Sequence, residues 1–307
     1  MSKATTPSRL TRETEKARFF LSNFRDLVQR RLSGRPGGTP ATGSAPDEAG
    51  PQAEDFPEVG PAASPTALYL DLMKRILANV IYSRAVPERF DDRWRNQIRG
   101  QGGAWPRMAH TMIGFRRLSN LQFCVEDVIE KGVPGDLIET GVWRGGACIF
   151  MRAILKAHGV RNRRVWVADS FEGLPPPNAN KYPADAGLRL HKSKALAVSV
   201  DEVRANFKEY GLLDEQVHFL RGWFRDTLPT APIERLAVLR LDGDMYESTM
   251  DALTSLYQRV SPGGYVIVDD YGAVPACRRA IEDFRRKQGT AEPLCEIDWS
   301  GVYWRRQ

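Results

Sequence analysis

The sequence predicts an α/β fold in which a doubly wound sheet of parallel strands is closed by an antiparallel hairpin. Three observations support this prediction. After Gly135, short apolar runs alternate with amphipathic segments of helical period. Glycines or aspartates follow directly after several of these runs, as is typical of strands whose carboxyl ends face one crevice. The last two runs are only four residues apart, which favours a hairpin between them.

Seven apolar runs are expected to be strands, with helices between the first five. They are residues 136–139, 165–168, 217–220, 236–241, 265–268, 294–297 and 302–304. The helix near 200–210 begins with a capping-box pattern, Ser199 followed by Glu202, and ends at Gly211. Five parallel strands followed by a hairpin, instead of a sixth strand–helix unit, are more typical of a methyltransferase sheet than of a dehydrogenase sheet.

The chain divides by composition into an N-terminal extension, a linker and a folded domain. Residues 1–33 are expected to form a basic amphipathic helix, since apolar residues recur there at helical spacing between Arg and Lys. Residues 34–65 are rich in Gly, Pro, Ala and Ser without apolar periodicity, which predicts a disordered linker. Residues 66–307 are expected to be the folded domain.

The folded domain is expected to begin with a helical cap over residues 66–131 and to continue as an α/β core over 132–307. Helical patterns cover 66–82 and 115–131. The stretch between them, near 87–109, is rich in Trp, Gly and Arg and is a candidate lid.

The net charge of +6 is confined to the N-terminus. Residues 1–35 contain nine Lys/Arg and three acids, a balance of +6, so the rest of the chain is neutral. We therefore expect no nucleic-acid partner. For the basic helix two interpretations stay open, because its pattern names no ligand. It could dock a partner or an anionic surface, or it could rest on its own domain or on a dimer mate.

Composition favours a cytoplasmic enzyme. Hydrophobic residues make up 42% of 307 positions, enough for one large core. No apolar stretch reaches the roughly 18 residues of a membrane span, and no secretory signal is recognisable. The four cysteines are widely spaced, which argues against a zinc cage or a disulfide framework and predicts buried thiols.

Four aspartates follow two of the expected strands. Asp242 and Asp244 come after the run 236–241, and Asp269 and Asp270 follow the next run. Because neighbouring parallel strands end at one crevice, these carboxylates should converge, and together they require a cation. No Cys or His accompanies them, so all-oxygen ligation favours Mg²⁺ over Zn²⁺.

A glycine-containing segment follows the first expected strand and precedes a helix at about 147–158. It runs Glu139-Thr-Gly-Val-Trp-Arg-Gly-Gly146. Its glycines allow a ligand to approach the backbone at a helix N-terminus, so we interpret it as a cofactor loop. The spacing of its glycines, at 141, 145 and 146, does not fit the GxGxxG motif of a dinucleotide-binding fold. An acid before the first glycine could meet the cationic amino group of a methionine moiety, whereas it would repel a pyrophosphate.

Two further segments are candidates for cofactor contacts. Asp169 and Ser170 end the second strand about 28 residues beyond Gly141, where a carboxylate can accept hydrogen bonds from ribose hydroxyls. Gly222, Trp223 and Phe224 follow the third strand and could sandwich an adenine. Ordinary core packing is the alternative for both rings.

Residues 66–307 resemble the macrocin O-methyltransferase (TylF-type) family, whose members depend on S-adenosylmethionine and Mg²⁺. The resemblance rests on motifs at 68–74, 109–114, 132–146, 168–173, 222–224, 241–246, 268–271 and 301–304. It implies a Rossmann-like class I methyltransferase sheet and methylation of sugar hydroxyls on macrolide or aminocoumarin antibiotics. It also implies a homodimer and a metal that grips neighbouring hydroxyls of the acceptor. Residues 1–65 lie outside the pattern.

The resemblance assigns roles to particular positions. The implied metal ligands are Asp242, Asp269 and Asp270, and Asp242 is also a candidate to accept the hydroxyl proton. His191, in a loop expected to overhang the crevice, is a second candidate general base, with an exposed loop histidine as the plainer interpretation. Asp244 is favoured as a charge at a helix N-terminus. The expected cofactor-binding residues are Thr111, Met112, Glu139, Thr140, Gly141, Arg144, Gly145, Asp169, Ser170, Gly222, Trp223 and Phe224.

Three alternatives remain at this point. A catechol-type phenol would also chelate Mg²⁺ and is the alternative acceptor. An Mg²⁺-dependent phosphatase also carries an Asp-x-Asp pair at a strand end, but on its first strand, whereas here at least three strands precede it. The third alternative is a non-catalytic domain that the basic helix tethers to an assembly.

Overall fold

The computed structural model describes residue 60 and residues 63–81 and 108–307. The expected basic helix, all but four residues of the expected linker and nearly all of the candidate lid lie outside the described residues. The corresponding predictions therefore stay predictions.

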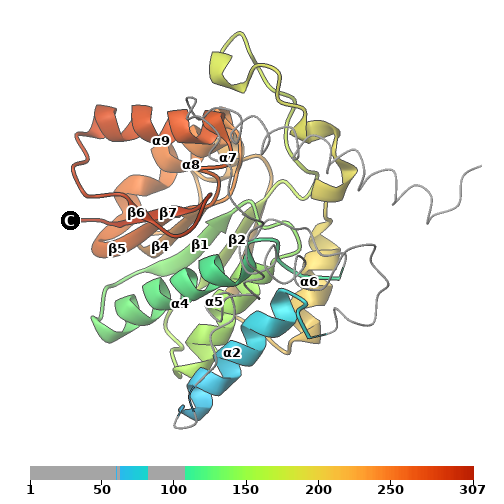
Figure 1. The fold of residues 1–307 in the computed structure, drawn as a ribbon, viewed down its shortest axis with the longest axis vertical. Coiled ribbons are helices and arrows are strands. Elements are labelled where there is room, and N and C mark those ends of the chain that lie inside the picture. The colour runs from blue at the N-terminus through green and yellow to red at the C-terminus, as the bar shows by residue number, and fades with distance from the viewer. Residues whose placement is uncertain (1–59, 61–62, 82–107) are drawn as a thin grey trace, which may run out of the picture.

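A seven-stranded sheet forms the centre of the domain, with strand order β3-β2-β1-β4-β5-β7-β6 (Figure 1). Neighbours among the first five strands are parallel, and β7 runs antiparallel to both β5 and β6. The strands are β1 Asp136–Thr140, β2 Val165–Asp169, β3 Val217–Arg221, β4 Leu236–Leu241, β5 Val260–Val268, β6 Cys295–Glu296 and β7 Val302–Arg305. The predicted doubly wound sheet with its closing hairpin is confirmed.

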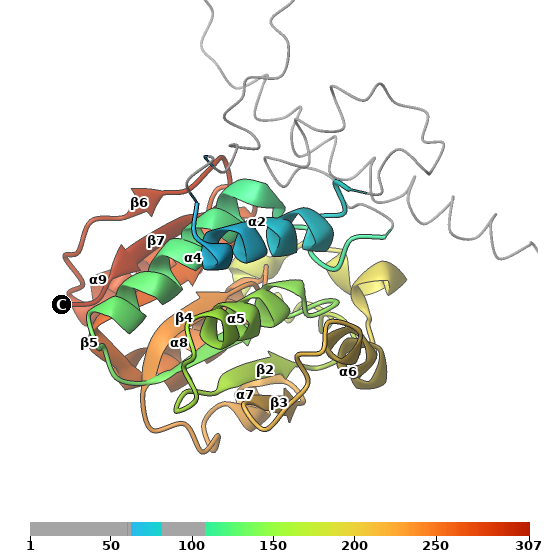
Figure 2. The ribbon, with the colours of Figure 1, turned by 90° about the horizontal axis from the view of Figure 1, so that it is seen from below.

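Helices cover both faces of the sheet (Figure 2). One apolar core joins the first face to α2 Pro65–Leu77, α4 Gly114–Glu130, α5 Gly146–Ala157 and α6 Val200–Glu209. A second core joins the opposite face to α8 Tyr246–Leu256 and α9 Pro275–Gln288. Alternating residues of each strand enter opposite cores, for example Leu137 and Ile138 of β1, as the pleat of a strand requires.

Local sequence signals explain several helix boundaries. Ser199 accepts a hydrogen bond from the Glu202 amide at 3.2 Å, so the predicted N-cap of α6 is present. Gly211 follows the helix with φ +64°, a left-handed conformation that favours glycine. Within residues 63–81 and 108–307, no helix combines the length and apolarity needed to cross a bilayer.

Three features differ from the sequence-based expectations. Helix α9 was not predicted, although its Ala280, Ile281 and Phe284 are buried against the second core. Strand β5 begins at Val260, five residues before the predicted start, because its first residues include Pro262, Gly263 and Gly264 and do not look like a strand. Cys295 is exposed, whereas a buried thiol was expected, because it lies on the short strand at the sheet edge.

Candidate active site

The order of the strands reverses between β1 and β4, and a cavity of about 540 Å³ lies where the carboxyl ends of these strands meet. Such a switch point is where ligands bind in open α/β sheets. Backbone hydrogen bonds hold the two strand ends together, since the Asp242 amide donates to the Thr140 carbonyl at 2.9 Å. Of the expected site residues, the following line the cavity: Thr111, Met112, Glu139, Gly141, Asp169, Ser170, Gly222, Trp223, Phe224, Asp242, Asp269 and Asp270.

Three of the four strand-end aspartates form a compact cluster. One carboxylate oxygen from each of Asp242, Asp269 and Asp270 lies within 4.8 Å of the others. Asp269 and Asp270 are buried, and the Asp242 side chain retains 23% exposure at the cavity. The sheet thus brings together the three carboxylates that the sequence proposes as metal ligands; their role as ligands remains a prediction.

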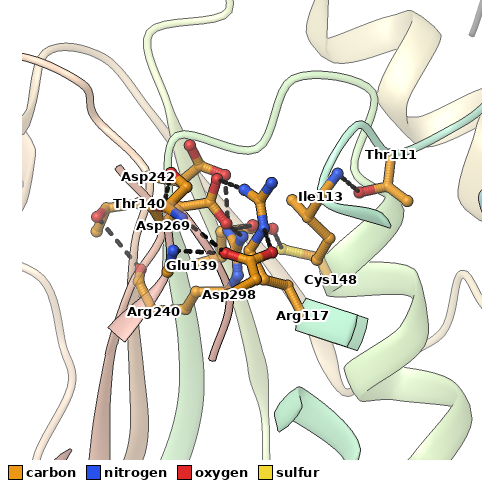
Figure 3. A network of polar contacts seen from close by, with 12 residues as sticks. Thr111, Ile113, Arg117, Glu139, Thr140, Cys148, Arg240, Asp242, Asp269 and Asp298 are labelled. Carbon is orange, nitrogen blue, oxygen red and sulfur yellow. Dashed lines mark hydrogen bonds and ion pairs between the residues drawn. The ribbon is translucent and has the colours of Figure 1, made fainter. Parts of the chain in front are cut away.

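Arg240 lies directly beneath this cluster (Figure 3). Its guanidinium is 1% exposed and pairs with Glu139 on β1, with Asp242 at 2.7 Å and with Asp269 after β5. It therefore connects the cofactor loop to the aspartate cluster from below.

A second buried arginine approaches from helix α4. Arg117 pairs with Asp269 and, through Nε at 3.0 Å, with Asp298 in the hairpin turn (Figure 3). Asp269 is thus held by two guanidinium groups, one on each oxygen. This arrangement leaves Asp242 and Asp270 as the carboxylates with more freedom to bind a ligand.

The carboxylates at this site outnumber the guanidinium groups. Among the described residues, Glu139, Asp242, Asp269, Asp270 and Asp298 gather around two guanidinium groups, those of Arg117 and Arg240. Burial and the neighbouring aspartates raise the pKa values of Asp242 and Asp270 well above the usual range. Asp270 Oδ2 is buried and has no hydrogen-bond partner within the described structure. Such an excess of negative charge and an unpaired oxygen fit a divalent cation.

Asp244 also lines the cavity, and burial together with Asp269 raises its pKa to about 7. It was expected to supply the charge at the N-terminus of α8. That position is taken by Asp185, whose carboxylate accepts hydrogen bonds from the first two amides of the helix.

The first acid of the cofactor loop, Glu139, is 2% exposed at the cavity wall. One oxygen pairs with Arg240, and the other accepts from the Cys148 thiol at 3.0 Å. Burial raises its pKa above the usual range although Arg240 opposes that shift. Glu139 is therefore placed between the cofactor loop and the aspartate cluster.

Gly141 shows why the loop needs a glycine. Its φ is +90°, and a Cβ there would lie 1.8 Å from the carbonyl oxygen of Asp242. Any larger residue would push the cofactor loop away from β4. The close approach keeps the loop beside the aspartate cluster.

Asp169 supports the same loop from β2. Its carboxylate accepts hydrogen bonds from the Val142 amide at 2.8 Å and from the Phe171 amide at 2.7 Å. Burial raises its pKa despite these bonds. Asp169 therefore fixes the loop as well as facing the cavity.

We expect Asp169→Ala to weaken S-adenosylhomocysteine binding by about 10- to 100-fold, because its charge-assisted hydrogen bonds to the loop amide of Val142 and to the Phe171 amide after β2 are lost. Calorimetric titration with S-adenosylhomocysteine measures the change in affinity. Asp136→Ala is a matched control: Asp136 also accepts two hydrogen bonds, from the Arg164 amide and Trp166 Nε1, but at the opposite end of the sheet. Equal affinities of the two variants would contradict the placement of the cofactor.

Four predicted site residues do not line the cavity. Thr140 is buried and its hydroxyl donates to the Arg240 carbonyl at 3.4 Å. Arg144 donates to the Ala109 carbonyl at 2.9 Å, and Gly145 precedes α5 with φ +85°. His191 lies in a short 3-10 helix, Leu190–Lys192, in which Leu190 lines the cavity and His191 does not. The structure thus does not bring His191 together with the aspartates.

Sequence reasoning missed both buried arginines and Asp298. A signal was present for Arg240, since an arginine inside an otherwise apolar strand must be paired when buried. Arg117 and Asp298 carry no such signal, because the partners of Arg117 lie 152 and 181 positions away in the sequence.

The sheet order and a glycine loop beside an acidic cluster at the switch point define a class I methyltransferase. The family model described as macrocin O-methyltransferase (TylF) matches residues 66–306, and the chain belongs to this family. The protein is therefore an O-methyltransferase, and this decides against the phosphatase alternative.

Named relatives agree with this assignment. Demethyldecarbamoylnovobiocin O-methyltransferase of Streptomyces niveus is 58% identical over 79% of this chain and 95% of its own length. Mycinamicin III 3''-O-methyltransferase of Micromonospora griseorubida is 54% identical over 78% of this chain and 96% of its own length. Among solved structures, the O-methyltransferase NovP superposes with a TM-score of 0.75 at 57% identity, covering 79% of this chain and 99% of NovP.

Proposed function

We propose that the protein transfers a methyl group from S-adenosylmethionine to a hydroxyl of a glycosylated natural product and that Mg²⁺ is required. The observation that carries this proposal is the convergence of three strand-end aspartates, with one unpaired buried oxygen, beside the glycine loop. The activities for which two relatives are named, on demethyldecarbamoylnovobiocin and on mycinamicin III, support the acceptor class.

The cofactor half of the proposed site consists of the loop after β1 and the ends of β2 and β3. Asp169 would bind the ribose, and Trp223 and Phe224 at the cavity wall would contact the adenine. Glu139, which shares Arg240 with the aspartate cluster, would face the methionine end. S-adenosylmethionine supplies the electrophilic methyl group.

The metal half consists of Asp242, Asp269 and Asp270. The donor set is all oxygen, as Mg²⁺ prefers, and the acids exceed the nearby guanidinium groups in number. A bound Mg²⁺ would lower the pKa of an acceptor hydroxyl. Arg117 and Arg240 orient Asp269 from two sides and thereby keep the cluster in place.

Asp242 is the proposed proton acceptor. It is the most exposed of the three clustered aspartates and is held by Arg240 at 2.7 Å on one oxygen. Its other oxygen can therefore face the acceptor. Transfer of the methyl group is then a direct displacement, and no covalent bond to the protein is needed.

The function is tested with radiolabelled S-adenosylmethionine and Mg²⁺. We expect label transfer to demethyldecarbamoylnovobiocin or mycinamicin III, and less to the corresponding aglycones and to catechol. Preferential methylation of catechol would favour the phenolic alternative. A titration with S-adenosylhomocysteine gives an independent check, and absence of binding would contradict the proposal.

Two assembly predictions accompany this function. A homodimer is proposed, and light scattering of the purified chain measures it. A docking role for the N-terminal helix is tested by deletion of residues 1–64, which should leave catalysis unchanged and abolish binding to the partner.

A further inference from the structure

One wall of the cavity is formed by a long connection between β2 and α6, residues 174–197, which we call the strap. It contains three short 3-10 helices, Pro183–Asp185, Leu190–Lys192 and Lys194–Leu196 (Figure 1). Among its cavity-lining residues are Leu188, Arg189 and Leu190. The strap therefore contributes side chains to the wall of the cavity.

Asp185 is the fully buried residue at the centre of the strap. Its two carboxylate oxygens accept hydrogen bonds from the amides of Tyr246 at 2.7 Å and Glu247 at 3.0 Å. These are the first two amides of α8, which have no partner within the helix. Met245, the helix's own N-cap residue, supplies no side-chain cap. Asp185 thus caps the N-terminus of this helix through a tertiary contact, from 61 positions away along the chain.

The helix that Asp185 caps also lines the cavity. Helix α8 starts two residues after Asp244, and its Glu247, Ser248 and Asp251 face the cavity opposite the strap residues. One buried carboxylate therefore fixes two walls relative to each other.

Two further contacts show that the strap is held along its length. The ring of Tyr182 packs on that of Tyr246, with centroids 5.8 Å apart. Toward the other end, Trp143 of the cofactor loop donates through Nε1 to the Ala195 carbonyl at 2.9 Å. The strap thus spans from the cofactor loop to α8, and Asp185 is its charged attachment at the α8 end.

We propose that Asp185 is a positioning residue for the acceptor: by capping α8 it holds the strap and the first turn of that helix as one binding surface. This inference rests on the proposed function only for the identity of the ligand. The attachment itself is a property of the fold and has its own measurement.

The kinetic test compares Asp185→Ala and Asp185→Asn with the unaltered enzyme, using demethyldecarbamoylnovobiocin and mycinamicin III as acceptors. We expect Asp185→Ala to raise the acceptor KM by about 10-fold or more while kcat and S-adenosylhomocysteine affinity change by less than about 3-fold. Asp185→Asn retains one acceptor oxygen and should give an intermediate KM, which keeps the test usable if the alanine variant does not fold.

Ser199→Ala is the matched control, because Ser199 caps α6 at the far end of the same connection with one hydrogen bond. It should leave the acceptor KM unchanged. An unchanged KM in both Asp185 variants would overturn the proposal. So would a parallel loss of S-adenosylhomocysteine affinity, since that indicates a general loss of structure.

Hydrogen exchange separates this inference from the proposed function. In Asp185→Ala, the amides of Tyr246 and Glu247 and those of the strap should exchange faster, and the amides of β1 should not. Unchanged exchange in the strap would overturn the attachment even if methyl transfer occurs. If neither acceptor is methylated by the unaltered enzyme, the proposed function fails, and the exchange pattern still decides whether Asp185 holds the strap.

Discussion

Asp242→Asn is expected to lower kcat by about 10²- to 10⁴-fold, the range associated with loss of a general base. The amide cannot accept the hydroxyl proton and is a weaker ligand for a hard cation. The affinity for S-adenosylhomocysteine should change by less than about 3-fold, because Asp242 serves the acceptor and not the cofactor. Steady-state kinetics and calorimetric titration measure the two quantities.

Asp214→Asn is the control for this substitution. Asp214 also pairs with an arginine, Arg152 at 2.6 Å, but it does not line the cavity. Its kcat should remain near that of the unaltered enzyme. A kcat for Asp242→Asn within a factor of about 3 of the control would refute the assignment of Asp242 to the chemistry.

The second large effect is on stability. Arg240→Met is expected to reduce the free energy of unfolding by about 3–5 kcal/mol, since it leaves the buried Glu139 without its cation and Asp269 with Arg117 alone. Glu139 and Asp269 are 2% and 4% exposed, so water cannot replace the guanidinium. Urea denaturation in EDTA measures the change without any contribution from a bound metal.

Arg152→Met provides the comparison for this stability change. The Arg152 side chain is 6% exposed, but it pairs with one aspartate, which keeps 26% exposure. Arg152→Met should therefore reduce the free energy of unfolding by less than Arg240→Met does. Equal losses would show that the three-carboxylate network around Arg240 contributes no more to stability than the single ion pair of Arg152.

The strand ends of the site were predictable because their chemistry is local. Asp242 and Asp269 each follow an apolar run directly, and Asp270 comes next after Asp269. The rule that parallel strands end at one edge brings the three together. Gly141 and Asp169 were found in the same way, from a strand, a turn and a helix in order. Patterns of this kind can be recognised in a single sequence, because they depend only on neighbouring residues.

The residues that orient this cluster could not be found in that way. Arg117 reaches Asp269 across 152 positions, and Asp185 reaches α8 across 61 positions. Their contacts depend on tertiary packing, which leaves no mark in the local pattern. The start of α8 is an example. The sequence suggested Asp244 as the charge at this position, whereas Asp185 in a distant loop binds the first amides of the helix.

Helix α9 was overlooked for a different reason. Its sequence contains Arg or Lys at five of fourteen positions, so its mean hydropathy is low although one face is apolar. The face formed by Cys277, Ile281 and Phe284 recurs at helical spacing and packs on the second core. Periodicity alone would have identified this helix, and composition obscured it.

Metal removal tests the central claim most directly. The rate of methyl transfer to demethyldecarbamoylnovobiocin or mycinamicin III, whichever is the better acceptor, is measured with Mg²⁺, then with excess EDTA, then after Mg²⁺ is restored. We expect transfer to stop in EDTA and to return with Mg²⁺, while S-adenosylhomocysteine affinity stays nearly constant throughout. Undiminished transfer in EDTA would contradict the metal role of Asp242, Asp269 and Asp270.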